Sequence, residues 1–167
     1  PGVCGDGIYD WDETSENCPQ DVPGCDLPDM SLSVRPDGSV LYKTSQAIGG
    51  FQFMINGATL NGDAAASGGD AGVDGAEFTL STNPDFQGDV STPNGPQNCA
   101  DLGACGDGKV VGVSLTGTTI PPSCGTLVEL NFLSGTPNFI HSIIASDASF
   151  MEIPFTYQYP AGSVFGC

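Results

Sequence analysis

The residues with the clearest chemical potential are six carboxylates near the start of the chain. They lie within the stretch 6–21, which contains no Lys, Arg or His: Asp6, Asp10, Asp12, Glu13, Glu16 and Asp21. Two carboxylates about 4 Å apart repel each other by about 1 kcal/mol even in water, and by more when they lose solvent. A bound cation would convert this repulsion into attraction.

Calcium is the cation that this pattern favours. Ca²⁺ takes roughly six to eight oxygen ligands from carboxylates and carbonyls, and the Asp10-Trp11-Asp12 spacing is one that wraps a hard cation. We therefore expect a Ca²⁺ site with these ligands: Asp6, Asp10, Asp12, Glu13 and Asp21. The segment is not an EF-hand, because no Gly follows the acidic triplet and no Glu stands at the twelfth position. A solvated acidic tail without an ion is the alternative.

Seven cysteines are many for a cytosolic chain and ordinary for a secreted one. We expect three disulfides: Cys4–Cys18, Cys99–Cys105 and Cys124–Cys167. The last would close a long loop and contribute about 4 kcal/mol on the chain-entropy model. Cys25 is then left as an intermolecular bridge or a free thiol, although another intramolecular set fits the count equally well. Zinc is not expected, because the chain has one His and no close cysteine pairs.

Charge and composition exclude several classes of function. The chain has 20 acids and three strong bases, a formal net charge of -17, so it lacks the basic clusters that bind nucleic acids or anionic membranes. No apolar run approaches the roughly 20 residues of a spanning helix, so no membrane insertion is expected. The sequence begins at Pro1 without an apolar leader, which predicts a mature secreted chain, extracellular or at the cell surface. An excised fragment is the alternative.

No pattern in the sequence predicts catalysis. His141 is the only histidine and lies in an apolar stretch, so we expect a core residue rather than a general base. The Gly-x-Ser-x-Gly motif that frames many serine nucleophiles is absent. Glu77, Glu129 and Glu152 fall on separate expected strands, and the sequence does not bring them together as the carboxylate pair of a glycosidase. We expect that the protein is not an enzyme.

The elements that must position these residues have a period of two. Apolar and polar residues alternate over five stretches: 51–56, 77–81, 111–115, 128–132 and 153–159. Such alternation is typical of half-buried antiparallel strands. The stretch 139–146 is apolar on both faces, which predicts a more central strand. With turn signals between the stretches, we expect an all-β, antiparallel two-sheet jelly-roll sandwich of about nine strands.

The chain divides into an irregular acidic, cysteine-containing N-terminal segment at 1–29 and a sandwich at 30–167 with a long loop at 82–108. The N-terminal segment holds eight of the 20 acids and few apolar residues. It cannot bury enough surface to offset its ordering entropy unaided. Order in this segment therefore requires disulfides, a metal ion or a surface on which it docks.

Short motifs resemble two known kinds of module. The stretches 42–58 and 112–117 and the turn at 146–149 resemble parts of cohesin-like domains, and the likeness covers roughly residues 30–160. The resemblance implies a jelly-roll sandwich with one sheet face that binds a dockerin-like partner. The Cys-Gly-Asp-Gly start and the later Cys-Pro-Gln-Asp resemble acidic modules of secreted proteins, in which another cysteine often stands at the position of Tyr9.

Two functions follow from these expectations. In the first, the protein is a secreted, non-enzymatic structural subunit that binds copies of itself head-to-tail, as a filament or surface layer. Its N-terminal segment and a first strand at Met30–Val34 would dock on the next copy, with Tyr9 and Trp11 as docking aromatics. In the second, the sandwich is an extracellular binding module for a dockerin-like protein or a glycan, with exposed aromatics such as Tyr42 stacking on sugar rings.

Overall fold

The computed structural model describes residues 2–6, 8, 10–14, 16–18, 20–73, 75–84 and 108–158, and the backbone of 90–92 and 95–97. One set of strands is β1 (Ser31–Val34), β2 (Ser39–Thr44), β4 (Ala66–Ser67), β9 (Ser123–Leu130) and β12 (Thr156–Tyr157). A second set is β3 (Gly50–Leu60), β5 (Thr79–Asn83), β8 (Gly108–Val113), β10 (Phe132–Ser146) and β11 (Glu152–Ile153). Two short strands, β6 (Val90–Thr92) and β7 (Gly95–Gln97), lie inside the predicted loop at 82–108.

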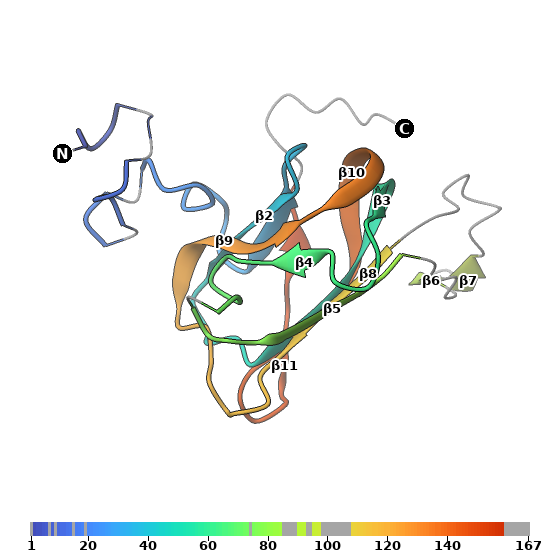
Figure 1. Cartoon of the computed structure of the whole chain (residues 1–167). Helices are drawn as coiled ribbons and strands as arrows, with labels where there is room; N and C mark the ends of the chain where they lie inside the picture. Colours follow the sequence, from blue (N-terminus) through green and yellow to red (C-terminus); the bar gives the residue numbers. More distant parts are fainter. Residues whose placement is uncertain are drawn as a thin grey trace.

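The two sets form two five-stranded sheets (Figure 1). Their orders are β12-β1-β2-β9-β4 and β11-β10-β3-β8-β5, and β6 and β7 make a separate hairpin. Neighbouring strands run antiparallel except β1 and β12, which are parallel. The described residues contain no helix long and apolar enough to cross a membrane. The fold is therefore all-β, as predicted, and its two mostly antiparallel sheets are those of a β-sandwich.

The alternation of β3 places its aromatic residues in the core. Phe53 and Ile55 have no exposed surface, and the rings of Phe51 and Phe53 stack with centroids 5.9 Å apart. Val40 and Val128 of the other sheet are buried in the same cluster. Each such side chain contributes about 1.5–3 kcal/mol relative to an exposed one, so this cluster is the main source of stability in the sandwich.

The inward face of β8 differs from the prediction. We expected Val111 and Val113 to share a face with Leu115, but the structure buries Val110 instead, and Leu115 beyond the strand is 76% exposed. Gly112 faces inward beside Val110, and a Cβ atom built on it would lie only 2.4 Å from the ring of Phe51. Because a glycine takes an inward position here, the apolar residues of the sequence predicted the wrong face of β8 to point into the core.

The region around β10 also departs from expectation. The strand predicted over 128–132 ends at Leu130, because Asn131 bonds through its backbone to Ala65 and Asn61 and Phe132 begins the next strand. β10 lies near an edge rather than at the centre of its sheet, since β11 pairs only with its last two residues.

His141 of β10 is partly exposed and is not the core residue that we expected. Its Nδ1 lies 3.1 Å from the Ser142 hydroxyl, and its ring packs 5.6 Å from that of Phe139. The register of β10 shifts between His141 and Ile144, and Ser142 has a positive φ of 51°. This irregularity turns the imidazole away from the core.

The strand β1, predicted to dock on another copy, is part of its own sheet. All four residues are buried, and β1 pairs with β2 along its whole length. On its other side, Ser31 and Leu32 pair with Thr156 and Tyr157 of β12. The order of β1 is therefore explained within one subunit.

Candidate functional site

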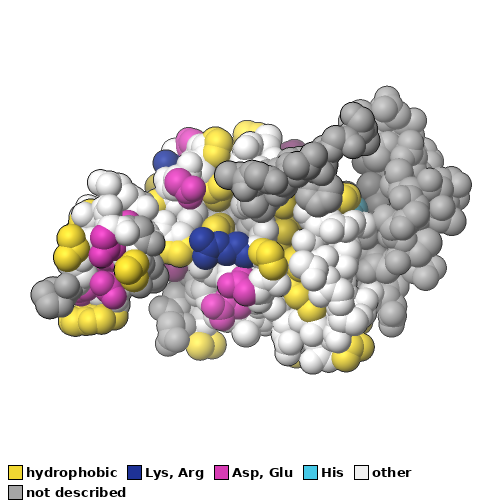
Figure 2. Space-filling view, turned by 90° about the horizontal axis from the view of Figure 1, so that it is seen from above, with side chains coloured by type: hydrophobic (Ala, Val, Ile, Leu, Met, Phe, Trp, Pro, Cys, Tyr) yellow, Lys and Arg dark blue, Asp and Glu magenta, His cyan; other side chains and the backbone are white. Residues whose placement is uncertain are grey.

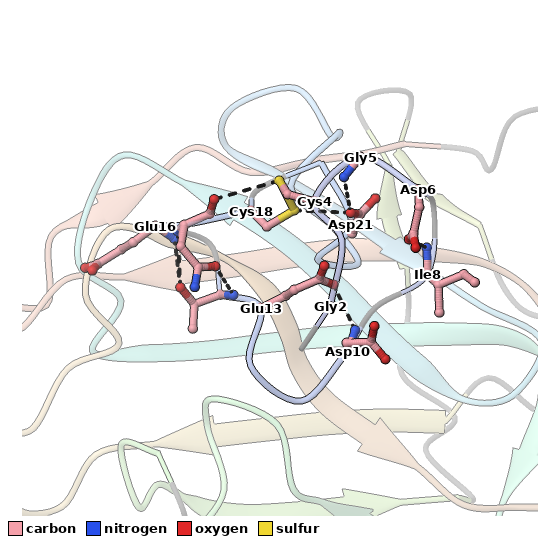
Figure 3. Close-up of a disulfide and its surroundings, with 12 residues drawn as sticks. Gly2, Cys4, Gly5, Asp6, Ile8, Asp10, Glu13, Glu16, Cys18 and Asp21 are labelled. Carbon is pink, nitrogen blue, oxygen red and sulfur yellow. Dashed lines mark hydrogen bonds between the residues drawn. A yellow bond between two sulfur atoms is a disulfide. The ribbon is translucent and has the colours of Figure 1, made fainter.

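A disulfide closes a loop at the start of the chain (Figure 3). It joins Cys4 to Cys18, the pairing expected for these two residues, with Cα atoms 5.3 Å apart. Asp21 is buried beside it, accepts the backbone N–H of Gly5, and has one carboxylate oxygen 3.1 Å from Cys18 Sγ. The bridge and Asp21 together give residues 4–21 a fixed frame.

Glu13 is the most deeply buried carboxylate of this loop, with 5% of its surface exposed. Its Oε2 accepts the backbone N–H of Asp10 at 2.8 Å, whereas its Oε1 has no hydrogen-bond partner in the part of the chain that the structure describes. A Cβ atom built on Gly2 would lie only 2.7 Å from Oε1, so the backbone passes this close to the oxygen because residue 2 is a glycine. A buried charged oxygen without a partner is destabilising, which marks Oε1 as an acceptor that the described residues leave unsatisfied.

The other predicted metal ligands make separate local contacts. Asp6 Oδ1 accepts the backbone N–H of Ile8 at 2.8 Å, and Asp12 Oδ1 accepts that of Gly2 at 2.9 Å. Asp21 belongs to the disulfide frame. These carboxylates therefore cap backbone turns of the loop and do not converge with one another.

Among the described residues, only Cys4, Cys18 and Asp21 bring three potential ligand atoms within 4.8 Å of one another. The two sulfur atoms are bonded to each other and so are not thiolate ligands. The expected set of five carboxylates is thus not assembled as a group. Asp10 and Glu13 remain neighbours, because the Asp10 N–H donates to Glu13 Oε2 and Gly2 packs closely against both residues.

A second disulfide corrects two of our predictions. Cys25 is neither free nor available to another molecule, because it pairs with Cys124 at a Cα separation of 4.9 Å. Cys124 therefore does not pair with Cys167. Three predicted disulfide residues lie outside the described part of the chain: Cys99, Cys105 and Cys167. The two disulfides that are described are compatible with an extracellular protein.

Glycines explain why Cys25 reaches β9. Gly24 has a φ of 94°, and a Cβ atom on it would lie 2.7 Å from the carbonyl oxygen of Gly125. The two backbones approach this closely only because both residues lack side chains. The Nζ of Lys43 donates to the carbonyl of Cys25 at 3.0 Å and fixes the same crossing. The N-terminal segment is thereby anchored to the strands β2 and β9 of its own subunit.

Beyond this anchor the segment projects from the sandwich and carries exposed apolar side chains. In Figure 1 it extends on the left, and Figure 2 shows acidic and hydrophobic side chains side by side on it. Trp11 is 88% exposed, Val3 66% and Ile8 62%. The other predicted docking aromatic, Tyr9, lies outside the described residues. The loop therefore displays an apolar surface on a covalently fixed frame.

A groove of about 1050 Å³ separates the N-terminal segment from the sandwich. Glu13, Glu16 and Pro23 line one side, and the strand β9 and the turn at 118–122 line the other. The charged side chains Arg35 and Glu129 also border it. The groove is open, mixed in character, and large enough for a peptide or a short polar chain.

A buried hydrogen-bond network supports the wall of this groove. The hydroxyl of Tyr42 lies 2.6 Å from Asp70 Oδ2 and 2.7 Å from Ser123 Oγ. Burial and the bond to Asp70 raise the pKa of Tyr42 well above its usual value near 10. The network holds the turn around Asp70 onto β9, where the Asp70 N–H also bonds the carbonyl of Thr126.

Sequence reasoning missed this network and treated Tyr42 as an exposed aromatic. The available signal was the Gly68-Gly69-Asp70 run, since glycines directly before a polar residue often mark a close backbone approach. A Cβ atom on Gly69 would lie 2.4 Å from the carbonyl oxygen of Leu127.

Comparisons with known proteins identify no relatives. No family model, no curated protein and no solved structure matches the chain. The cohesin-like resemblance therefore stays a prediction, and any functional statement must come from the geometry above.

Proposed function

We propose that the protein is a secreted, non-enzymatic structural subunit whose copies associate head-to-tail through the N-terminal segment. The sandwich would have the jelly-roll connectivity of the cohesin-like domains that it resembles. One observation carries the proposal: Trp11 is 88% exposed on a loop that two disulfides hold in place. Indole surface is costly to leave in water, and rigid exposed tryptophans are typical anchors of protein interfaces.

The order of the segment does not itself argue for a partner. We expected that a segment poor in apolar residues needs an ion, a covalent link or a neighbouring copy to be ordered. The Cys25–Cys124 disulfide supplies a covalent link within the subunit. The support for docking is therefore the surface that the loop displays, and not the fact that the loop is ordered.

The complementary surface is the end of the sandwich where two turns meet around Gly49. The Gly49 N–H bonds the carbonyl of Ser146 and the Gly49 carbonyl accepts the N–H of Ser114, so the turns that follow lie together. They carry three exposed apolar side chains: Leu115 at 76%, Phe150 at 84% and Met151 at 66%.

Phe150 is held there in an unusual conformation. Its φ is 62°, which is rare for a bulky residue and unfavourable by about 1–3 kcal/mol. The Asp147 carboxylate accepts the N–H groups of Ser149 and Met151 and maintains this turn. A turn that is strained and still exposes a phenylalanine favours a role in contact. Since this surface differs from the Trp11 loop, association is heterologous and continues from copy to copy.

Net charge sets a condition on this assembly. At -17, copies repel one another at low ionic strength, and the Debye length falls to about 8 Å only at physiological salt. We therefore expect association to increase with salt between about 10 and 150 mM.

Sedimentation velocity and negative-stain microscopy of the full chain test the proposal. Trp11→Ala and Phe150→Ser each remove one side of the contact and are expected to give monomers. A mixture of the two variants retains one complete contact per pair, so it should give dimers and no longer species. Val73→Ser is the matched control, because Val73 is 80% exposed elsewhere on the sandwich and its loss should leave assembly unchanged.

A wild-type chain that stays monomeric at high concentration, in physiological salt with calcium, contradicts the proposal. Equal assembly of wild type and Trp11→Ala contradicts it as well. Circular dichroism melts of each variant show whether a loss of assembly reflects unfolding. We expect no change in melting for Trp11→Ala, because its side chain packs on little else.

The groove supports a second candidate, an extracellular binding module for a dockerin-like protein or a glycan. The favouring observation is the open groove of about 1050 Å³ with Arg35 and Glu129 at its border. Among the described residues that line it, Tyr42 is the one aromatic and is fully buried, so sugar stacking in the groove has little support. A glycan array and a pull-down with wild type and Glu129→Lys test this function, and binding that is absent from both assays removes it.

A further inference from the structure

The buried carboxylate of Glu13 leads to an inference that concerns the same loop as the proposed docking. We propose that Glu13 Oε1, together with the carboxylates of Asp10 and Asp12 and backbone carbonyls of the loop, binds one Ca²⁺ ion. The inference starts from an oxygen whose residue is 95% buried and which has no hydrogen-bond partner among the described residues. Exposed acidic residues alone would not carry it.

The groups around Oε1 come from the same acidic loop. Figure 3 shows the Glu13 side chain reaching toward Asp10, whose backbone N–H binds the other carboxylate oxygen at 2.8 Å. Gly2 borders the same space, and a Cβ atom there would lie 2.7 Å from Oε1 and 2.8 Å from Asp10 Cβ. A larger residue at position 2 would clash with Glu13 and Asp10, so the glycine lets the backbone pass close to Oε1.

The local charge favours a divalent ion. Asp10, Asp12 and Glu13 stand within four residues, and the stretch 6–21 contains no Lys, Arg or His. Asp10 and Asp12 are only partly buried. Asp12 Oδ1 accepts the N–H of Gly2, so the ion would use the Asp10 carboxylate and the second oxygen of Asp12. Ca²⁺ accepts such a mixed and flexible set of oxygen ligands, whereas Mg²⁺ demands near-ideal octahedral geometry.

The site lies on both sides of Trp11 in the sequence. An ion held by Asp10, Asp12 and Glu13 fixes the backbone that carries the indole and reduces the negative charge beside it. If the proposed docking through Trp11 is correct, Ca²⁺ strengthens assembly at this loop. The Ca²⁺ site itself does not depend on that docking and is measured on the monomer.

Terbium luminescence of the full chain measures the site directly. Trp11 is the only tryptophan, so Tb³⁺ bound at this loop gives tryptophan-sensitised emission, which Ca²⁺ should displace. We expect a single saturable site with a Ca²⁺ dissociation constant on the order of 10⁻⁴–10⁻³ M, the range of extracellular modules. Glu13→Gln keeps the bond to the Asp10 N–H and should weaken the affinity by about tenfold or more.

Two further variants keep the test decisive. Asp10→Asn, which leaves Glu13 in place, should also weaken Tb³⁺ and Ca²⁺ binding by about tenfold. Glu16→Gln removes the same charge from an exposed side chain of the loop and should bind as wild type does. No saturable emission from wild type, or equal Ca²⁺ affinity in wild type and both ligand variants, overturns the proposal.

The experiment separates the ion site from the docking. Ca²⁺ binding with monomeric wild type keeps the site and rejects the proposed docking. Conversely, the docking is kept if assembly is lost in Trp11→Ala but is the same with chelator, with Ca²⁺ and in Glu13→Gln. If Tb³⁺ emission is absent as well, the Ca²⁺ site is rejected.

Discussion

The sandwich and the N-terminal segment hold their shapes by different means. In the sandwich, side chains such as Phe53, Ile55 and Leu127 are fully buried between two sheets. In the described residues from 2 to 24, the buried apolar residues are only Cys18 and Val22. The segment is instead closed by one disulfide and attached by another.

The source of stability in each region decides where its apolar side chains can lie. A region with a real core must turn its apolar residues inward, because their burial is its source of stability. A region fixed by covalent bonds has no such requirement, and it can leave Trp11 in solvent without losing its shape. The N-terminal segment is therefore suited to present side chains, and the sandwich is suited to carry it.

Removal of the two disulfides should affect the two regions very differently. The Cys25–Cys124 pair closes 99 residues of chain, and a loop of that length is worth about 4.7 kcal/mol on the chain-entropy model. The double variant Cys25→Ser/Cys124→Ser should lower Tm by more than about 10 °C, measured by circular dichroism. The double variant Cys4→Ser/Cys18→Ser should change Tm by less than about 2 °C and expose residues 4–18 to protease. Equal shifts in Tm for the two variants would show that segment and sandwich unfold as one unit.

The same contrast explains what the sequence predicted. The all-β class and the inward face of β3 followed from alternating Phe51, Phe53 and Ile55, because apolar burial leaves a period of two in the sequence. The phase of β8 was mispredicted where Gly112 takes an inward position against Phe51. A glycine on the core face carries no hydropathy signal, so periodicity cannot detect it.

The candidate site was less predictable, since its contacts are long-range and polar. Cys4 and Cys18 are near in sequence and enclose the acidic loop, so their pairing was accessible. The Cys25–Cys124 pair depends on the close approach of Gly24 to another strand, which spacing does not encode. The acidic residues were recognised as a group, but only the fold distinguishes the buried Glu13 from the partly buried Asp10 and Asp12 and the exposed Glu16.

Tyr42→Phe tests a buried polar group that is satisfied, the opposite of Glu13. It removes the hydroxyl that contacts Asp70 and Ser123 at 2.6 and 2.7 Å. We expect a loss of about 1.5–3 kcal/mol in the free energy of unfolding, because one partner is a carboxylate. Urea unfolding at pH 8 measures this loss. Ser123→Ala, which leaves the bond to Asp70, should lose only about 1 kcal/mol.

The pKa of Tyr42 adds a pH dependence with a definite sign. Burial raises the folded-state pKa above the ordinary value near 10, so the folded protein keeps this proton where the unfolded chain releases it. The associated stability is present below about pH 10 and falls by about 1.4 kcal/mol per pH unit above it. The difference between wild type and Tyr42→Phe should therefore shrink from pH 9 to pH 11. A constant difference over that range contradicts the assignment.

The smallest expected effect comes from a hydrogen bond that occurs in both regions, in which an aspartate accepts a backbone N–H of a turn. Asp37, in the turn between β1 and β2, accepts the backbone N–H of Ser39 at 2.9 Å, and Asp6 accepts that of Ile8 at 2.8 Å. Asp37→Ala should lower the free energy of unfolding by about 0.5 kcal/mol, since its turn sets the pairing of two core strands. Asp6→Ala should leave it unchanged, because the N-terminal loop adds little to the cooperative core. Urea unfolding at pH 7 gives both values.

The two aspartate variants should also differ in how their effect on stability depends on pH. The N–H of Ser39 lowers the pKa of Asp37 below its ordinary value of 3.8, so its contribution is present above that pH and is lost as the pH falls through the lower folded-state value. The difference between wild type and Asp37→Ala should hold from pH 7 to about 5 and disappear below about pH 3, while Asp6→Ala shows none at any pH. A loss in Asp6→Ala as large as that in Asp37→Ala would mean that the turn at Asp6 belongs to the cooperative unit. The N-terminal loop would then unfold together with the sandwich, and the distinction between a region stabilised by its core and a region fixed by disulfides would be wrong.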